Sequence, residues 1–177
     1  MPISRPQPGE YAPYYDTYFR QLPPDATDLL GLLRAQPAAL RRLLGGLSDA
    51  DATAPTAPGK WSVKQILTHL LDTERVFAYR ALALARGEQQ PLTGFEQDDY
   101  VAAADANARS LPELLTEHAA QRAATVALLA GLPEAAHTRT GTTAGTSGVS
   151  VRALAWVIAA HEIHHQRLLA ALYPARG

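Results

Sequence analysis

The sequence contains no cysteine, which excludes a disulfide framework, a cysteine-ligated zinc site and a catalytic thiol of its own. Long apolar runs are also absent. The longest covers residues 153–160, too short to span a membrane, and the first residues lack the apolar core of a signal peptide. We therefore expect a cytoplasmic protein. Any metal site has to use nitrogen and oxygen ligands, which directs attention to the six histidines.

The chain also lacks an excess of charge of either sign. Sixteen lysines and arginines oppose seventeen aspartates and glutamates without a long run of one sign, so we expect no nucleic-acid partner and no membrane partner. A length of 177 residues corresponds to about one domain. We expect a single domain over residues 1–177, in which residues 1–23, rich in proline and tyrosine, form an extension packed on the bundle described next.

Helical periodicity is what the sequence does contain. Apolar residues recur at intervals of three and four in four stretches, and no region shows the alternation typical of a set of strands. Two stretches begin with capping boxes, at Ser62 and at Ser110. Pro37 lies inside the first stretch and predicts a kink or break near Gln36. The predicted helices span residues 24–46, 62–87, 110–131 and 151–173.

Four amphipathic helices of this length favour an all-α fold, a four-helix bundle. The connections are unequal. Residues 88–109 are long enough to run from one end of a bundle to the other, which allows a crossover between the second and third helices. Within this connection, residues 96–106 are expected to form a short helix. Residues 138–150, rich in glycine, serine and threonine, are predicted to be a flexible loop before the fourth helix.

Two histidines of the fourth helix carry the main chemical signal. His161 and His165 are four residues apart, so their side chains lie on one helix face, and that face is otherwise apolar. Burying two imidazoles costs free energy unless each is hydrogen-bonded or bound to a metal. Such a pair can offer two nitrogens to one metal ion. A pair of hydrogen-bonded histidines inside a bundle is the structural alternative.

A third ligand has to come from elsewhere in the chain, because no histidine or acidic residue follows His165. His69 is the candidate, on the apolar face of the second helix, although a lone histidine there is also typical of an ordinary core residue. Asp72 and Thr73 follow His69 by three and four residues, where they can orient the imidazole or meet a substrate.

The remaining histidines have weaker patterns around them. We expect His118 and His137 to be solvated, and His164 to act behind the ligands or at an interface, since it lies about 100° around the helix from His165. The N-terminal aromatic cluster is expected to cap one end of the bundle, although it could border a pocket instead. Its members are Tyr11, Tyr14, Tyr15, Tyr18 and Phe19.

His161, Glu162 and His165 also satisfy the H-E-x-x-H motif, in which Glu162 is the general base of a zinc protease. Such proteases usually take a third ligand from downstream of the motif, and here only twelve residues follow it, without a candidate. No strand is predicted that could hold a peptide substrate. A protease is therefore disfavoured.

The ordered set of one histidine near the start of the second helix and H-x-x-x-H on the fourth resembles the DinB/YfiT-like family of metal-dependent enzymes. The likeness covers nearly the whole chain. It is carried by the segments Trp61–Leu70, Asp72–Arg75, Val149–Leu154 and His161–Arg167.

The resemblance implies a four-helix bundle in up-down-down-up order, frequent homodimers, and a divalent metal, zinc or nickel, held by His69, His161 and His165. It also implies a thiol-dependent S-transferase that uses a low-molecular-weight thiol such as bacillithiol, mycothiol or glutathione and acts on a small electrophile. Glu162 and Asp72 are the candidate catalytic residues. The alternatives are a non-catalytic metal-binding bundle that serves in a stress response, and a metal-dependent hydrolase in which Glu162 is the base.

Overall fold

Serine caps set where two long helices of the bundle begin. The Ser62 hydroxyl accepts a hydrogen bond from the Gln65 backbone N–H, and the Gln65 side chain accepts one from the Ser62 N–H. Ser110 and Glu113 form the same reciprocal pair. Each pair satisfies backbone donors that the first turn of a helix leaves unpaired. Both capping boxes predicted from the sequence are therefore confirmed.

The structure, a computed structural model, describes residues 2–173. The four long helices that it contains begin and end within five residues of the predicted bounds. The elements in chain order are η1 (Pro13–Tyr15), α1 (Asp16–Phe19), α2 (Leu29–Leu44), α3 (Asp49–Thr53), α4 (Val63–Ala85), α5 (Gln97–Ala103), η2 (Ala106–Ala108), α6 (Leu111–Ala130), η3 (Glu134–Ala136), β1 (Thr140–Thr143), β2 (Thr146–Ser150) and α7 (Val151–Leu172).

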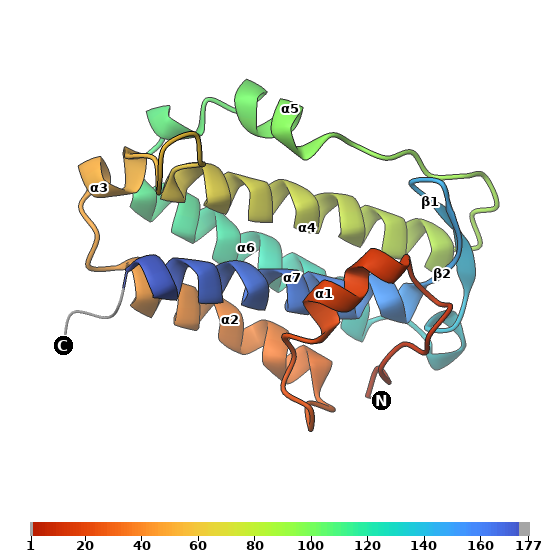
Figure 1. The fold of residues 1–177 in the computed structure, drawn as a ribbon. Helices are drawn as coiled ribbons and strands as arrows, with labels where there is room; N and C mark the ends of the chain where they lie inside the picture. The colour runs from red at the N-terminus through yellow and green to blue at the C-terminus, as the bar shows by residue number, and fades with distance from the viewer. Residues whose placement is uncertain (1, 174–177) are drawn as a thin grey trace.

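Helices α2, α4, α6 and α7 form a bundle in which α4 and α2 each pack against both α6 and α7 (Figure 1). The connection over residues 88–109 carries α5 and returns along the outside of α4 to the end where α4 began. Consequently α6 runs in the same direction as α4, and the helix order is up-down-down-up. The predicted all-α bundle and its long crossover are confirmed. None of the helices in the described residues is long and apolar enough to span a bilayer.

Helix α2 continues through Pro37, so the break predicted near Gln36 does not form. Proline has no N–H, and it therefore leaves the Leu33 carbonyl without its helical donor. The guanidinium of Arg122, on α6, donates from Nη1 to this carbonyl oxygen at 3.2 Å. A side chain of a neighbouring helix thus replaces the missing hydrogen bond, which is why the proline is tolerated inside the helix.

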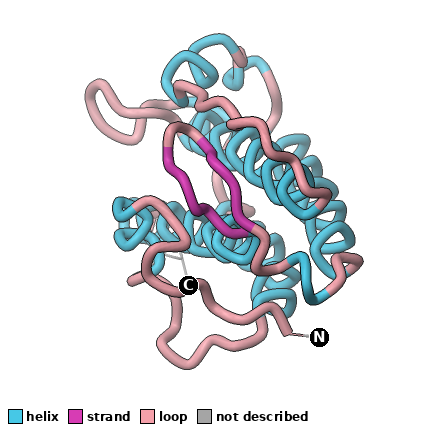
Figure 2. The backbone as a smooth tube through the Cα atoms, turned by 90° about the vertical axis from the view of Figure 1, so that its right-hand side faces the viewer, coloured by secondary structure: helices cyan, strands magenta, loops and turns pink. Residues whose placement is uncertain are grey.

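The flexible loop predicted over residues 138–150 is instead an antiparallel hairpin of β1 and β2, at one end of the bundle (Figure 2). Ala144 and Gly145 both have positive φ, 47° and 79°, as a tight hairpin turn requires. The crossover pairs with the hairpin, because the Leu92 N–H donates to Thr142 and the Leu92 carbonyl accepts from Ala144, both at 2.9 Å. These long-range bonds order a segment whose composition suggested disorder.

The N-terminal segment packs against the start of α7 and the hairpin. The indole N–H of the buried Trp156 donates to the carbonyl oxygens of Ile3 at 3.0 Å and Ser4 at 2.9 Å. The Glu10 carboxylate accepts hydrogen bonds from the Ser150 hydroxyl at 2.8 Å and from the Arg152 guanidinium. The hydrogen bonds from Arg152 outweigh partial burial and lower the pKa of Glu10.

Replacing Glu10 with glutamine is expected to lower the free energy of unfolding by about 1 kcal/mol at neutral pH. A lowered native pKa means that the unfolded chain binds the proton first. The stabilisation by Glu10 is therefore present above the ordinary carboxyl pKa of 4.5 and is lost as pH falls through the lowered native value. Thermal unfolding at neutral and at acidic pH should show a difference from wild type only at neutral pH. Glu134→Gln, at an exposed position, is the matched control, and an equal loss in both variants would contradict the anchoring role.

Candidate metal centre

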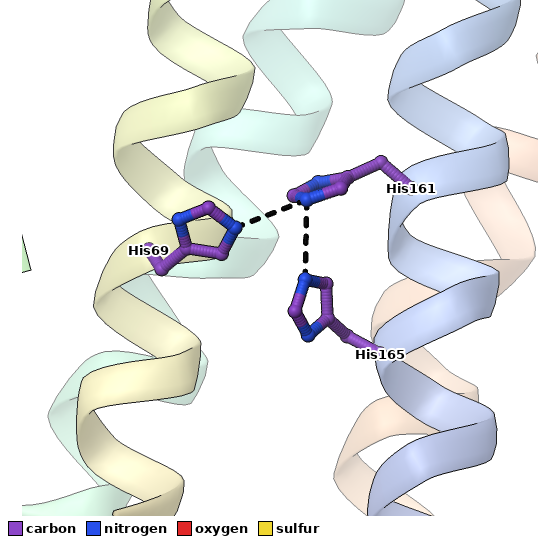
Figure 3. A group of neighbouring side chains, drawn as sticks. All are labelled: His69, His161 and His165. Atoms are coloured by element: carbon purple, nitrogen blue, oxygen red, sulfur yellow. Dashed lines mark hydrogen bonds between the residues drawn. The ribbon is translucent and has the colours of Figure 1, made fainter. Parts of the chain in front are cut away.

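Three imidazoles converge between α4 and α7 (Figure 3). His69 comes from the second turn of α4, and His161 and His165 come from successive turns of α7. The Nε2 atom of His161 lies 3.0 Å from Nε2 of His69 and 3.1 Å from Nε2 of His165. His69 and His161 are buried and His165 is partly buried. The structure thus brings together the three histidines that the sequence pattern singled out.

Hydrogen bonds among the rings cannot satisfy this arrangement. An imidazole nitrogen carries either one proton or one lone pair, so Nε2 of His161 can form one of the two close N···N contacts as a hydrogen bond and not both. Three lone pairs directed at one point suit a metal ion instead. Two nitrogens at about 2.0–2.1 Å from a tetrahedral ion lie roughly 3.3 Å apart, close to the observed spacing. The donor set therefore fits a divalent ion that accepts imidazole ligands.

Burial keeps the three rings neutral, as metal ligands must be. Loss of hydration lowers the pKa of His69 to about 4, with a small opposing effect of Asp98, and lowers that of His165 to about 3. The same loss of hydration, together with the neighbouring imidazoles, lowers the pKa of His161 well below its ordinary value. At neutral pH the cluster consequently offers lone pairs and no positive charge.

Neighbouring side chains hold the three imidazole rings in place. The Thr73 hydroxyl lies 3.4 Å from Nδ1 of His69, so an Nδ1 proton donated to it leaves the Nε2 lone pair free. The indole of Trp61 lies against His69, with ring centroids 5.0 Å apart, and Tyr18 meets His161 edge-on at 5.2 Å. Of the two residues expected to orient His69 or meet a substrate, Thr73 is the one that touches the ring.

The cluster borders a cavity of about 710 Å³. Its walls come from the N-terminal segment, α4, the crossover, the hairpin and α7, and they include His69, Thr73 and His161. The volume lies within the range of about 300–1,000 Å³ that is common for small-molecule sites. Tyr14, Tyr15 and Tyr18 also line it, so the N-terminal tyrosines border a pocket rather than simply cap the bundle.

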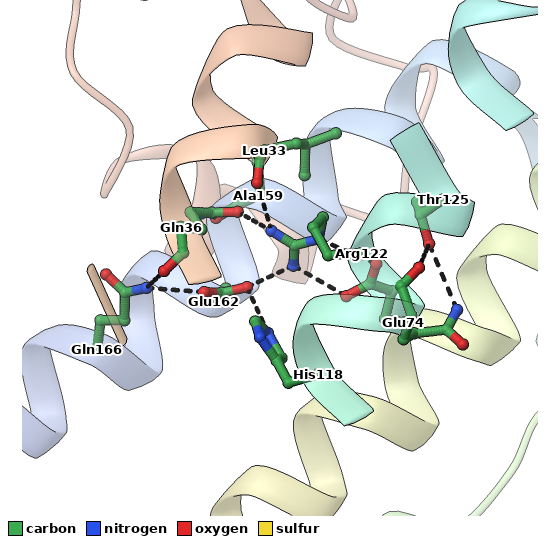
Figure 4. Close-up of polar contacts among 10 residues, drawn as sticks. Leu33, Gln36, Glu74, His118, Arg122, Thr125, Ala159, Glu162 and Gln166 are labelled. Atoms are coloured by element: carbon green, nitrogen blue, oxygen red, sulfur yellow. Dashed lines mark hydrogen bonds and ion pairs between the residues drawn. The ribbon is translucent and has the colours of Figure 1, made fainter. Parts of the chain in front are cut away.

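Glu162 lies in a buried polar network (Figure 4). Its carboxylate is paired with the guanidinium of Arg122 and lies 3.1 Å from Nε2 of His118, and Gln166 Nε2 donates to it at 2.7 Å. Burial opposes ionisation of Glu162, but the His118 hydrogen bond and the Arg122 charge outweigh it and lower the pKa of the carboxyl. A carboxylate held in this way is poorly suited to take a proton as a general base.

Arg122 and Glu74 complete this network, and neither is predicted from the sequence pattern. Glu74 of α4 accepts from Arg122 Nε at 3.0 Å and from Nη2 at 2.9 Å, a bidentate pair. Glu74, His118 and Glu162 have ligand atoms close enough together for a metal ion. However, the Arg122 guanidinium already pairs with both carboxylates, so the cluster is an ion-pair network. Charged residues within apolar helical stretches are the sequence feature that could have predicted this network.

His118, His137 and Asp72 are placed differently from the predictions. His118 and His137 are buried rather than solvated, and the His137 Nε2 atom has no hydrogen-bond partner among the described residues. Other elements of the fold cover both imidazoles, and the sequence pattern alone does not predict that packing. His164 lies beside the cluster, its ring 5.1 Å from that of His165. Asp72 lies 3.4 Å from Arg75 and is not among the residues lining the cavity.

Comparisons with solved structures show the same fold. YfiT from Bacillus subtilis, described as "a probable metal-dependent hydrolase with an unusual four-helix bundle topology", is 17% identical with a TM-score of 0.75, covering 95% of this chain and 90% of that one. A mycothiol-dependent maleylpyruvate isomerase is also 17% identical, with a TM-score of 0.66, covering 90% of this chain and 64% of that one. At this identity the likeness concerns the fold alone.

Sequence comparisons identify relatives and a family. A "putative metal-dependent hydrolase" of Geobacillus thermodenitrificans is 31% identical over 88 residues, 50% of this chain. That match spans 48% of the relative, about half of its length. A protein of Geobacillus kaustophilus with the same description is 25% identical over 154 residues, 86% of each chain. The family model of the DinB superfamily matches residues 32–169, from within α2 to within α7. Because that match includes all four long helices and the three converging histidines, the chain belongs to the DinB superfamily.

Proposed function

We propose that this protein is a metal-dependent enzyme that activates a low-molecular-weight thiol for transfer to an electrophile, with His69, His161 and His165 as the metal ligands. The observation that carries the proposal is the convergence of three Nε2 atoms beside a cavity of about 710 Å³, whose wall includes His69 and His161. The thiol is of the bacillithiol, mycothiol or glutathione type. Such thiols are kept reduced in the cytoplasm, where we expect the protein to act.

A divalent ion at this position, zinc or nickel, supplies Lewis acidity that favours deprotonation of a thiol or a water in the cavity. The chain's own residues prepare that chemistry. Three neutral imidazoles leave the charge of the ion uncompensated, and Thr73 holds the His69 ring. Tyr18 covers one side of His161, which limits the access of bulk water.

The placement of the carboxylates favours a thiol over water as the nucleophile. Glu162 is paired with Arg122, and Asp72 is paired with Arg75. A free thiol has a pKa of about 8.5 and needs little assistance to ionise, whereas water, with a pKa of roughly 15.7, gains more from a positioned base. Because the two carboxylates expected to act as bases are both paired with arginines, the site is better matched to a thiol.

The experiment that tests this proposal supplies purified, metal-loaded protein with glutathione, bacillithiol or mycothiol and a chlorodinitrobenzene. In the reaction a carbon–sulfur bond forms, the carbon–chlorine bond breaks, chloride leaves and the thiol proton passes to solvent. We expect at least one thiol to be consumed in proportion to enzyme, with activity lost after chelation and restored by zinc or nickel. A rate that is independent of protein for every thiol would contradict the proposal and favour a non-catalytic metal-binding bundle.

Hydrolysis is the second candidate, because both Geobacillus relatives carry the description of a metal-dependent hydrolase. The same preparation should be assayed for release of nitrophenol from nitrophenyl esters without any thiol. Metal-dependent release in the absence of thiol, together with no thiol consumption, would assign the hydrolase activity in place of the transferase. Glu162→Gln then separates the roles of Glu162, because a general base would lose turnover in this variant and a network member would lose stability.

A further inference from the structure

Arg80 is a buried cation in the wall of the same cavity. It is 3% exposed and lies on α4, on the helix face that also carries His69, Thr73 and Phe77. Its Nη2 atom donates to the backbone carbonyl of Thr93, in the crossover, at 2.6 Å. That bond uses one of the five N–H groups of the guanidinium. The group is also 5.8 Å from the centroid of the Phe77 ring.

Arg80 differs from the other buried cations among the described residues in having no acidic partner. Lys64 pairs with Asp49, and Arg122 pairs with Glu74 and Glu162. Arg80 has no carboxylate at salt-bridge distance in residues 2–173. Burial lowers its pKa, and the opposing influences come from tyrosines rather than from an acidic group. A buried and unpaired guanidinium is costly in free energy, unless something else provides the counter-charge.

The cavity is where that counter-charge can enter, since Arg80 lines it and its remaining donors have no hydrogen-bond acceptor within residues 2–173. We propose that Arg80 binds a carboxylate on the molecule that occupies the cavity, either on the thiol or on the electrophile. A single guanidinium matches the single charge and the two oxygens of a carboxylate. This inference rests on the proposed function and names the chemical class of its substrate.

The helix also sets a length for that substrate. Eleven residues separate His69 from Arg80, and at about 1.5 Å per residue their Cα atoms are about 16 Å apart along α4. After allowing for the reach of both side chains, the reactive end and the carboxylate are separated by about 10 Å. A short acid such as mercaptopropionate cannot reach both positions. The substrate is therefore an elongated molecule with the reactive group at one end and the carboxylate at the other.

Calorimetric titration of the metal-loaded protein can test this with thiols matched in length. Mercaptooctanoic acid and mercaptooctanol, with terminal thiols, differ only in the carboxylate. We expect the acid to bind wild type about tenfold more tightly than the alcohol, the affinity ratio of one charge-assisted hydrogen-bonded pair. Arg80→Gln should abolish this preference and leave the affinity for the alcohol unchanged, and Arg80→Lys should keep part of it. Mercaptopropionic acid should show no dependence on Arg80.

A second arm with chlorooctanoic acid and chlorooctanol, without thiol, shows whether the carboxylate belongs to the electrophile. The proposal is overturned if neither pair shows a preference for the acid in wild type, or if the preference survives in Arg80→Gln. Equal binding of acid and alcohol in both pairs, with metal bound, would remove the role of Arg80 but leave the proposed function standing. If none of these compounds binds, the proposal for Arg80 fails, and the proposed function is decided by its own thiol-consumption assay. Unchanged alcohol affinity in Arg80→Gln shows that the variant is folded.

Discussion

Replacing Arg122 with methionine is expected to lower the free energy of unfolding by about 3–5 kcal/mol. The substitution leaves the carboxylates of Glu74 and Glu162 buried without their counter-charge. It also removes the donor for the Leu33 carbonyl that Pro37 exposes. A loss of this size is a large part of the total stability of an ordinary domain. Urea unfolding followed by circular dichroism measures it.

Arg75→Met is the matched control, because Arg75 also pairs with two carboxylates, Asp72 and Glu117, but its side chain is 45% exposed. Exposed ion pairs contribute about 0–1 kcal/mol. Adding Glu74→Gln and Glu162→Gln to Arg122→Met should recover part of the loss, since neutral amides are less costly to bury than charges. Equal effects of the two arginine substitutions would show that the buried network is not a main source of stability.

Replacing His161 with alanine is expected to abolish metal binding at neutral pH. The Nε2 atom of His161 lies within 3.1 Å of those of both His69 and His165. Removing it leaves only two nitrogens to bind the metal ion. We expect an affinity loss of at least about 100-fold, because even the partners that orient a ligand contribute about 10–100-fold. Elemental analysis of the purified protein and competition with a chromophoric chelator give the metal content and the affinity.

His164→Ala is the control for this measurement. It lies on the same helix, three residues from His161, and its ring is outside the group of three converging nitrogens. We expect it to keep the metal content of wild type, and His69→Ala to resemble His161→Ala. If His161→Ala keeps a full complement of metal, the assignment of the three histidines as ligands is wrong, and the proposed function loses its basis.

Most of the helical framework could be predicted from the sequence, because its determinants are local. The capping boxes at Ser62 and Ser110 act within four residues, and the apolar spacing of each stretch identifies the face that packs inward. The spacing of His161 and His165 likewise depends on one helical turn. These features required no knowledge of what packs against each helix.

The hairpin could not be predicted, because its determinants are remote in sequence. Strands β1 and β2 have no alternation of apolar and polar residues. Ala144 has a positive φ, although alanine is not a residue type that predicts one. The bonds from Leu92 that order the hairpin come from the crossover, about fifty residues earlier in the chain. Composition therefore indicated a flexible loop where the tertiary structure forms part of a cavity wall.

By itself the sequence determined the four helices, the inward-facing histidine pair and the need for nitrogen ligands in a chain without cysteine. Only the tertiary structure decided that Glu162 pairs with Arg122 and that Arg80 has no carboxylate at salt-bridge distance among the described residues. The physical reason is that helical periodicity specifies a face, whereas burial and the choice of counter-charge depend on residues that other helices bring into contact.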